Sequence, residues 1–141
     1  MRRRLDDGYE LDDDPARVDV VAVHDYLANH SYWAEGRLLE TVTRLIREAN
    51  RIVGLYHEGN QVGFCRAHTD GVTLAYLADV YVLPEHQGRR LGTALVTEMV
   101  DGAPFANIKW VLHTSDGHAL YRKLGFGEPS FKLMERQART V

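Results

Sequence analysis

The chain has 141 residues, of which 45% are hydrophobic, and its formal net charge is -3. This length suits one hydrophobic core, so we expect a single domain over residues 1–141. The negative charge argues against nucleic-acid binding, and no apolar run reaches about 18 residues, so no membrane span is expected. The arginines near the N-terminus precede no apolar segment and Cys65 is the single cysteine, so we expect a cytoplasmic protein.

The first half of the chain predicts one strand and two helices. Val20, Val23 and Leu27 recur at helical spacing, and a longer apolar stripe begins at Leu38. The aromatic stretch between these patterns ends in a glycine and is typical of a loop. We therefore expect, after a frayed Arg2–Arg4, strand Gly8–Leu11, helix Val18–Asn29, loop His30–Gly36 and helix Arg37–Ala49.

Two turn signals, Glu58-Gly59-Asn60 and Asp70-Gly71, divide the middle of the chain. They predict an antiparallel meander of three strands: Arg51–His57, Gln61–Thr69 and Thr73–Leu83. The third strand is almost entirely apolar, which is typical of a strand covered on both faces.

A basic, glycine-containing turn follows this third strand. Residues Pro84–Leu91 include two arginines, and Leu91, Leu95 and Met99 then share one helical face. We expect that helix over Gly92–Val100. A helix start presents unpaired N–H groups and the positive end of its dipole, so this turn predicts a phosphate site.

The remaining elements complete the predicted fold. We expect a break over Gly102–Asn107, strand Lys109–His113, helix Asp116–Leu124 with Asp116 as N-cap and Gly125 as stop, and a last strand Phe131–Glu135. A helix separates Lys109–His113 from the preceding strand, so these two strands should be parallel. The order β-α-α-β-β-β-α-β-α-β predicts an α/β (α+β) fold, with a mixed, mostly antiparallel sheet and helices on both faces.

Three segments carry a family resemblance: LADVYVLPEHQGRRLGTALV at Leu77–Val96, the strand Lys109–His113, and HALYRKLGF at His118–Phe126. Together they resemble the GNAT superfamily of acyl-CoA-dependent N-acetyltransferases. The segment SYWAEG is similar to small bacterial members. The resemblance implies that acetyl-CoA is the co-substrate. It also implies that a primary amine attacks the thioester directly, through a tetrahedral intermediate.

The family's pyrophosphate loop, Gln/Arg-x-x-Gly-x-Gly/Ala, corresponds to Gln87–Gly92, with Arg90 where the family usually has glycine. A positive φ at Arg90 would cost about 1–2 kcal/mol, so we expect a helical turn there with the side chain outward. By resemblance, loop N–H groups hold pyrophosphate, the strand edge pairs with the pantetheine arm, and the Val82 N–H polarises the thioester carbonyl. The implied cofactor-binding residues are Val80, Tyr81, Val82, Gln87, Gly88, Arg89, Arg90, Leu91, Gly92 and Thr93.

The resemblance also implies one catalytic residue and leaves another open. Tyr121 matches the family's general acid, since a phenol with a pKa of about 10 is protonated at neutral pH; the alternative is a tyrosine that only packs. A base must also deprotonate the attacking ammonium. The candidates are Asp79, a carboxylate in an apolar strand that needs a partner or a function, and His113 at a strand end. His24 and a water chain are the alternatives.

The acceptor site is expected beside the first two helices, where Tyr32, Trp33 and Glu35 suit an amine with an apolar or aromatic body. Trp33 could instead plug the edge of the core. We expect a small-molecule amine, with a protein lysine or N-terminus as an alternative acceptor. A non-catalytic acyl-CoA sensor and an interaction domain are the rival functions.

Three further expectations concern metal, thiol chemistry and assembly. The seven histidines show no H-E-x-x-H motif or zinc spacing, so no metal is expected. Cys65 lies in mid-strand and is expected to be a small buried hydrophobe rather than a nucleophile. The chain is expected to be a monomer or a homodimer, paired through an exposed edge strand at Phe131–Glu135.

Overall fold

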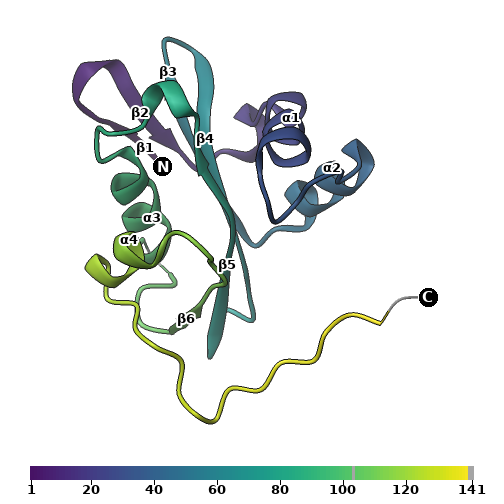
Figure 1. The fold of residues 1–141 in the computed structure, drawn as a ribbon. Helices are drawn as coiled ribbons and strands as arrows, with labels where there is room; N and C mark the ends of the chain where they lie inside the picture. Colours follow the sequence, from purple (N-terminus) through teal and green to yellow (C-terminus); the bar gives the residue numbers. More distant parts are fainter. Residues whose placement is uncertain (103, 140–141) are drawn as a thin grey trace.

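A six-stranded mixed sheet in the order β1-β2-β3-β4-β5-β6 forms the centre of the computed structural model, which describes residues 1–102 and 104–139 (Figure 1). Neighbouring strands are antiparallel except β5 and β6, which are parallel as predicted. The elements are β1 (Arg2–Arg4), β2 (Tyr9–Asp12), α1 (Val20–His30), α2 (Leu39–Glu48), β3 (Arg51–His57), β4 (Asn60–Thr69), β5 (Leu74–Val82), α3 (Leu91–Asp101), β6 (Lys109–Val111) and α4 (His118–Lys123).

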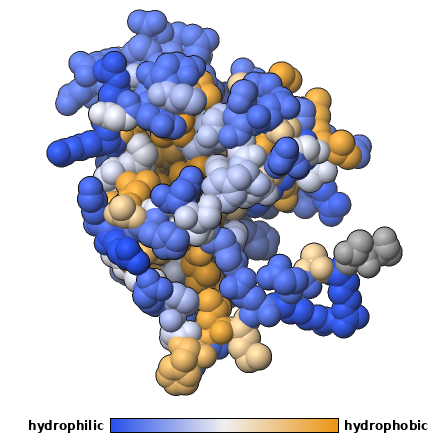
Figure 2. Space-filling view, viewed as in Figure 1, coloured by the Kyte–Doolittle hydropathy of each residue, from blue (hydrophilic) through white to orange (hydrophobic). Residues whose placement is uncertain are grey.

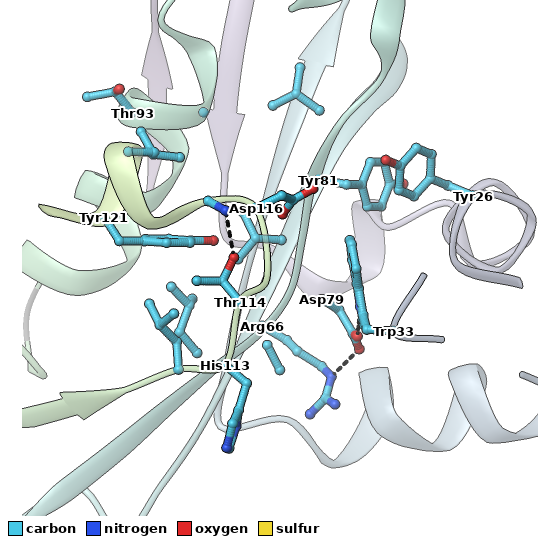
Figure 3. Close-up of a pocket in the computed structure, with 18 of the residues that line it drawn as sticks. Tyr26, Trp33, Arg66, Asp79, Tyr81, Thr93, His113, Thr114, Asp116 and Tyr121 are labelled. Atoms are coloured by element: carbon cyan, nitrogen blue, oxygen red, sulfur yellow. Dashed lines mark hydrogen bonds and ion pairs between the residues drawn. The ribbon is translucent and has the colours of Figure 1, made fainter. Parts of the chain in front are cut away.

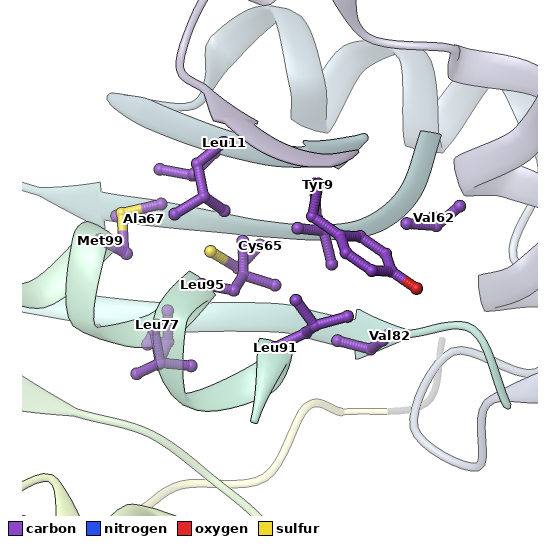
Figure 4. Packing of buried hydrophobic residues seen from close by; sticks show 13 residues of the cluster. Tyr9, Leu11, Val62, Cys65, Ala67, Leu77, Val82, Leu91, Leu95 and Met99 are labelled. Carbon is purple, nitrogen blue, oxygen red and sulfur yellow. The ribbon is translucent and has the colours of Figure 1, made fainter. Parts of the chain in front are cut away.

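Helices cover both faces of the sheet, which confirms the predicted fold class. Helices α1 and α2 lie on one face, and α3 and α4 lie on the other (Figure 1). The apolar stripe of α2 buries Val42 and Ile46 against β3 and β4, with Phe64 at the centre of that cluster. On the opposite face Leu95 and Met99 of α3 are fully buried against the sheet (Figure 4).

Cys65 belongs to the second of these cores. It lies on β4, is 0% exposed, and packs among the aliphatic residues beneath α3 (Figure 4). Burial raises the pKa of its thiol, because a low-dielectric environment disfavours the thiolate. The expectation of a buried small hydrophobe is confirmed.

The N-terminal arginines form a strand rather than a frayed end. Strand β1 pairs antiparallel with β2. Arg2 Nε lies 2.8 Å from Glu10 Oε2 and Arg3 Nη2 lies 3.0 Å from Glu98 Oε2. The prediction was wrong because the segment pairs with β2, the next strand in the chain, and carboxylates on β2 and α3 face its basic side chains.

The predicted strand Phe131–Glu135 is also absent. These residues follow an irregular path, and Phe131 and Met134 are 93% and 91% exposed. The segment leaves the body of the molecule as a thin, mostly hydrophilic chain (Figures 1 and 2). A strand needs a neighbouring edge for its N–H and C=O groups, and β6 is only three residues long.

Two elements of the C-terminal third, β6 and α4, are shorter than predicted. Strand β6 ends at Val111 instead of His113, and α4 begins at His118 with Gly117 as N-cap, so Asp116 is not the cap. Gly125 has φ +92°, as a helix stop requires. The predicted break over residues 102–107 includes residue 103, which lies outside the described residues. No helix in residues 1–102 and 104–139 is long and apolar enough to cross a bilayer.

Candidate active site

A cavity of about 660 Å³ opens where β5 and β6 separate (Figure 3). The two strands are in register only from Leu74 opposite Lys109 to Tyr76 opposite Val111. Beyond this point β5 continues for six residues to Val82, whereas β6 has ended. The cavity brings together every predicted site residue except Arg89 and Glu35, which are exposed and do not line it.

A β-bulge at Asp79 changes the direction of β5. Phe64 of β4 faces Tyr81 and Arg66 faces Ala78, so β5 has one extra residue here, and Asp79 has φ +55°. A one-residue slip moves side chains to the opposite face of a sheet. Leu77 accordingly packs in the core beneath α3, whereas Tyr81 packs in the core beneath α1 and α2.

Three side chains hold the Asp79 carboxylate in place. Its Oδ1 accepts a hydrogen bond from Trp33 Nε1 at 2.9 Å. Its Oδ2 accepts from Arg37 Nη1 at 2.9 Å and from Arg66 Nε at 2.7 Å. These bonds offset the strain of a left-handed backbone at a residue other than glycine. They favour the structural alternative for Asp79 over the general base, because each oxygen already accepts from a donor.

The strand edge beyond the bulge offers backbone groups to the cavity. The Leu83 N–H donates to the Val62 carbonyl of β4 at 2.8 Å. Successive N–H groups alternate in direction along a strand, so the Val82 N–H points the other way, toward the open edge. The Val82 carbonyl points to that edge as well, and accepts from Gln87 Nε2 at 2.8 Å.

The loop after β5 has two residues in the left-handed region. Gly88 has φ +82°, and Arg90, the N-cap of α3, has φ 61° and ψ 21°. The expected helical turn at Arg90 is therefore wrong, because the backbone must reverse within this short loop to start α3. The N–H groups of Leu91, Gly92 and Thr93 belong to the first turn of α3 and have no acceptor within the helix. Arg90 lines the cavity, whereas Arg89 does not.

Tyr121 projects its hydroxyl from α4 into the cavity (Figure 3). Its ring meets Phe126 edge to face, with centroids 5.8 Å apart. A Cβ at position 117 would lie 2.8 Å from the ring, so Gly117 permits this close approach. Burial raises the pKa of Tyr121 to about 12, and the nearby charges, including that of Asp116, act in the same direction. The hydroxyl therefore stays protonated at neutral pH, as proton donation requires.

His113 lies between a hydroxyl and a carboxylate. Its Nδ1 is 2.6 Å from the Tyr76 hydroxyl, and its Nε2 is 3.0 Å from Glu135 Oε2 on the C-terminal segment. An Nε2–H tautomer would donate to Glu135 and accept from Tyr76. His24 instead faces the Arg37 carbonyl at 3.0 Å, which agrees with a packing role.

Aromatic side chains form the wall near α1. Tyr26 stacks on Tyr81 with ring centroids 4.0 Å apart, and Tyr32 meets Trp33 edge to face at 5.1 Å. Trp33 is thus neither a free surface residue nor a core plug, since its indole N–H binds Asp79 and it lines the cavity.

The sequence did not identify Tyr26, Arg37, Arg66, Tyr76 and Asp116 as cavity residues. One signal was present: Arg66 is a charged residue inside an apolar strand, as Asp79 is, and such charges need partners. In the part of the chain that the structure describes, no three His, Cys, Asp or Glu side chains are grouped so that they could hold a metal ion.

Comparison with known proteins identifies consistent relatives. A family model described as "Acetyltransferase (GNAT) family" matches residues 8–126. A Gibberella zeae protein named for a proposed acetyltransferase activity is 31% identical over 138 residues, covering 83% of this chain and 78% of that protein.

Solved structures agree with these matches. A GNAT-family protein from Xanthomonas campestris pv. campestris, also a proposed acetyltransferase, is 35% identical with a TM-score of 0.87, over 92% of this chain and 93% of that one. A Clostridium acetobutylicum protein solved with acetyl-CoA is 17% identical with a TM-score of 0.69, over 97% of this chain and 96% of that one. The second likeness concerns the fold alone.

Proposed function

The chain belongs to the acetyltransferase (GNAT) family, and from this premise we propose that it transfers the acetyl group of acetyl-CoA to a primary amine. One observation carries the proposal: the open edge of β5 is followed, after the loop 83–90, by the N-terminus of α3, and the Tyr121 hydroxyl points into the same cavity. A strand edge, a phosphate-binding helix start and a proton donor are the parts that thioester aminolysis requires.

The backbone supplies the binding of the co-substrate. The N–H groups of Leu91, Gly92 and Thr93 are suited to the pyrophosphate, at the positive end of α3. The edge of β5 from Val80 to Val82 is suited to pair with the amide groups of the pantetheine arm, as an added strand would. The Val82 N–H then stabilises the oxyanion that develops on the thioester carbonyl.

Side chains supply the proton transfers. We assign to Tyr121 the proton that the departing thiolate receives, since its raised pKa keeps it protonated. For the proton that the ammonium loses, we favour His113, through the Tyr76 hydroxyl that contacts its Nδ1. Asp79 is assigned a positioning role, because three donors already occupy its oxygens.

Calorimetric titration of acetyl-CoA tests the first part of the proposal. We expect micromolar binding, and a loss of at least about 100-fold in Gly92→Glu, which places a carboxylate beside the expected pyrophosphate. Gly92→Ala is the matched control: its Cβ would make only an ordinary contact, 3.7 Å from Leu120, so binding should fall less than about threefold.

Turnover is tested by following CoA thiol release with a panel of primary amines. Release that depends on the amine supports the enzyme, and the acetylated amine is identified by mass spectrometry. Tight binding without turnover on any amine would instead favour a non-catalytic acyl-CoA sensor. Absence of binding by the wild-type chain would contradict both.

A further inference from the structure

Two arginines share a single carboxylate at the acceptor end of the cavity. Both Arg37 and Arg66 bind Asp79 Oδ2. The side chains of Arg37, Arg66 and Asp79 are only 21%, 15% and 3% exposed. This mostly buried group therefore carries one formal positive charge in excess, and a buried charge without a partner is costly.

Both guanidinium groups retain unused donors. A guanidinium has five N–H donors in a planar fork. Arg37 uses Nη1 on Asp79 and Arg66 uses Nε, and no other described residue accepts from either side chain. In Figure 3 the two terminal nitrogens of Arg66 point away from Asp79. Such a fork suits a carboxylate or a phosphate.

A negatively charged side chain also lines the cavity. Asp116 is not the N-cap of α4 and lines the cavity. Its negative charge acts on both Tyr26 and Tyr121, adding to the effect of burial in raising the pKa of each hydroxyl. It makes no ion pair with another described residue, and it can accept from an ammonium group.

The other charged residues around the cavity do not neutralise Arg37, Arg66 or Asp116. His113 faces Glu135 and Tyr76, and Arg90 lies at the opposite end, on the loop assigned to pyrophosphate. The acceptor compartment is thus positive at Arg37 and Arg66 and negative at Asp116.

We infer that the acceptor is an amine that also carries a carboxylate or phosphate group, bound by the free N–H donors of Arg66 and Arg37 with its ammonium end toward Asp116. This inference rests on the proposed acetyl transfer. Asp79 precedes Val82 by three residues, which is at most about 10 Å along the strand, and the bulge at Asp79 shortens this separation. The anionic group and the amine should therefore be several bonds apart, as in ω-amino acids and aminoalkyl phosphates, rather than on one carbon as in α-amino acids.

Matched acceptors test the inference. We would compare ε-aminocaproate with its amide, which differ mainly in the anionic charge, and aminopropyl phosphate with aminopropanol, which differ in the whole phosphoryl group. At least one anionic member should have a kcat/KM about tenfold or more above its neutral partner. The pair that shows the larger ratio distinguishes carboxylate from phosphate.

Substitutions test whether the arginines cause the preference for anionic acceptors. In Arg66→Gln the ratio should fall toward one, and Arg66→Lys, which keeps the charge without the fork, should retain part of it. Arg44→Gln is the matched control, since Arg44 is 70% exposed on α2 and pairs with Glu48; its ratio should equal that of the wild type. The ratio within one variant does not depend on how much of the protein is folded.

The possible results distinguish failure of the anionic acceptor subsite from failure of the proposed acetyl transfer. Ratios near one with active enzyme would overturn the inference and leave acetyl transfer intact. If no amine is acetylated, the same pairs are compared by the rise in unfolding midpoint that they produce in the protein–CoA complex. A larger rise with the anionic members, lost in Arg66→Gln, would support the subsite although the proposed turnover had failed. Equal rises would overturn it.

Discussion

The two ends of the cavity are built from different parts of the chain. The end assigned to acetyl-CoA is made of backbone: the open edge of β5 and the first N–H groups of α3, contained in one continuous stretch from Val80 to Thr93. The acceptor end is made of side chains from separate elements, with Trp33 and Arg37 in one loop, Arg66 on β4, Asp79 on β5 and Asp116 before α4.

This difference determines what substitutions can do. A backbone site tolerates most changes of side chain and fails mainly where a new group enters the space of the ligand. A side-chain site depends on charges that stabilise one another, so the loss of one member affects the others. Substitutions at the acceptor end should therefore alter stability and specificity together, whereas those at the other end should alter mainly binding, with small effects on stability where the loop backbone is strained.

The largest effect is expected for Asp79→Ala. It leaves two guanidinium groups mostly buried without their counter-ion and removes the bonds that hold the bulge, so the free energy of unfolding should fall by about 3–5 kcal/mol. Urea denaturation measures this. Asp79→Asn, which can still accept from Trp33, should lose less. Lost turnover with unchanged stability would instead identify Asp79 as the base.

Tyr121→Phe should lower kcat by about 100-fold, because the thiolate would leave without its proton donor. The affinity for acetyl-CoA should stay the same, since the backbone end is untouched. The matched control is Tyr9→Phe, whose hydroxyl bonds His86 at 2.7 Å outside the cavity; it should retain the wild-type kcat. Steady-state kinetics with calorimetry distinguishes these results, and an unchanged kcat in Tyr121→Phe would exclude the acid role.

The pH dependence should reflect the raised pKa of Tyr121. The protonated phenol is the donor, so a pKa of about 12 keeps it competent at pH values where an ordinary phenol, with a pKa of about 10, has lost most of its proton. Near pH 11 the expected difference in donor population approaches tenfold. Rates of wild type and Tyr121→Phe, measured up to that pH, should keep their ratio. If the ratio of the wild-type rate to the Tyr121→Phe rate fell toward one above pH 10, the raised pKa of Tyr121 would be contradicted.

The same shift has a consequence for stability. A folded-state pKa above the unfolded value stabilises the protein fully below about pH 10. This contribution is lost as the pH rises through about 12. In Tyr121→Phe, the loss of stability at alkaline pH should therefore be smaller than in the wild type.

The smallest effect is expected at Arg90. With φ 61°, a side chain strains the backbone, and Arg90→Gly should raise the free energy of unfolding by about 1 kcal/mol. Arg89 does not have a positive φ, so Arg89→Gly should lower it by about 0.5–1 kcal/mol. Opposite signs in thermal unfolding would confirm the strain. If acetyl-CoA affinity also falls in Arg90→Gly, the side chain contacts phosphate.

The backbone end was the predictable one. A buried strand, a glycine-containing turn and an amphipathic helix are consecutive in the sequence, and each follows from local periodicity. The turn Pro84–Leu91 was identified as a phosphate site for this reason, whereas the family resemblance singled out Gln87–Gly92 within it. The left-handed backbone at Arg90 was not predicted, because an arginine gives no signal for positive φ.

The acceptor end was predicted only in part. Trp33 and Asp79 were singled out, but their contact, and the convergence of Arg37 and Arg66, require a bulge that shifts the register of β5 by one residue. Nothing in the alternation of LAYLADVYV marks that slip. The same holds for Arg2–Arg4, which pairs with β2, and for Phe131–Glu135, which has no strand partner among the described residues, because local alternation does not show whether a partner edge is available.

Chemical modification of Cys65 can report local opening of the structure between β4 and α3. The one sulfhydryl of the chain lies at 0% exposure under α3, so in the native state a thiol reagent meets only the CoA that turnover releases. Under conditions that open the structure around Cys65, the same reagent modifies this thiol, and the rate of modification measures how often the structure opens. The rate at which Cys65 is modified, divided by the rate for an unprotected thiol, is the fraction of time that the layer between β4 and α3 stands open.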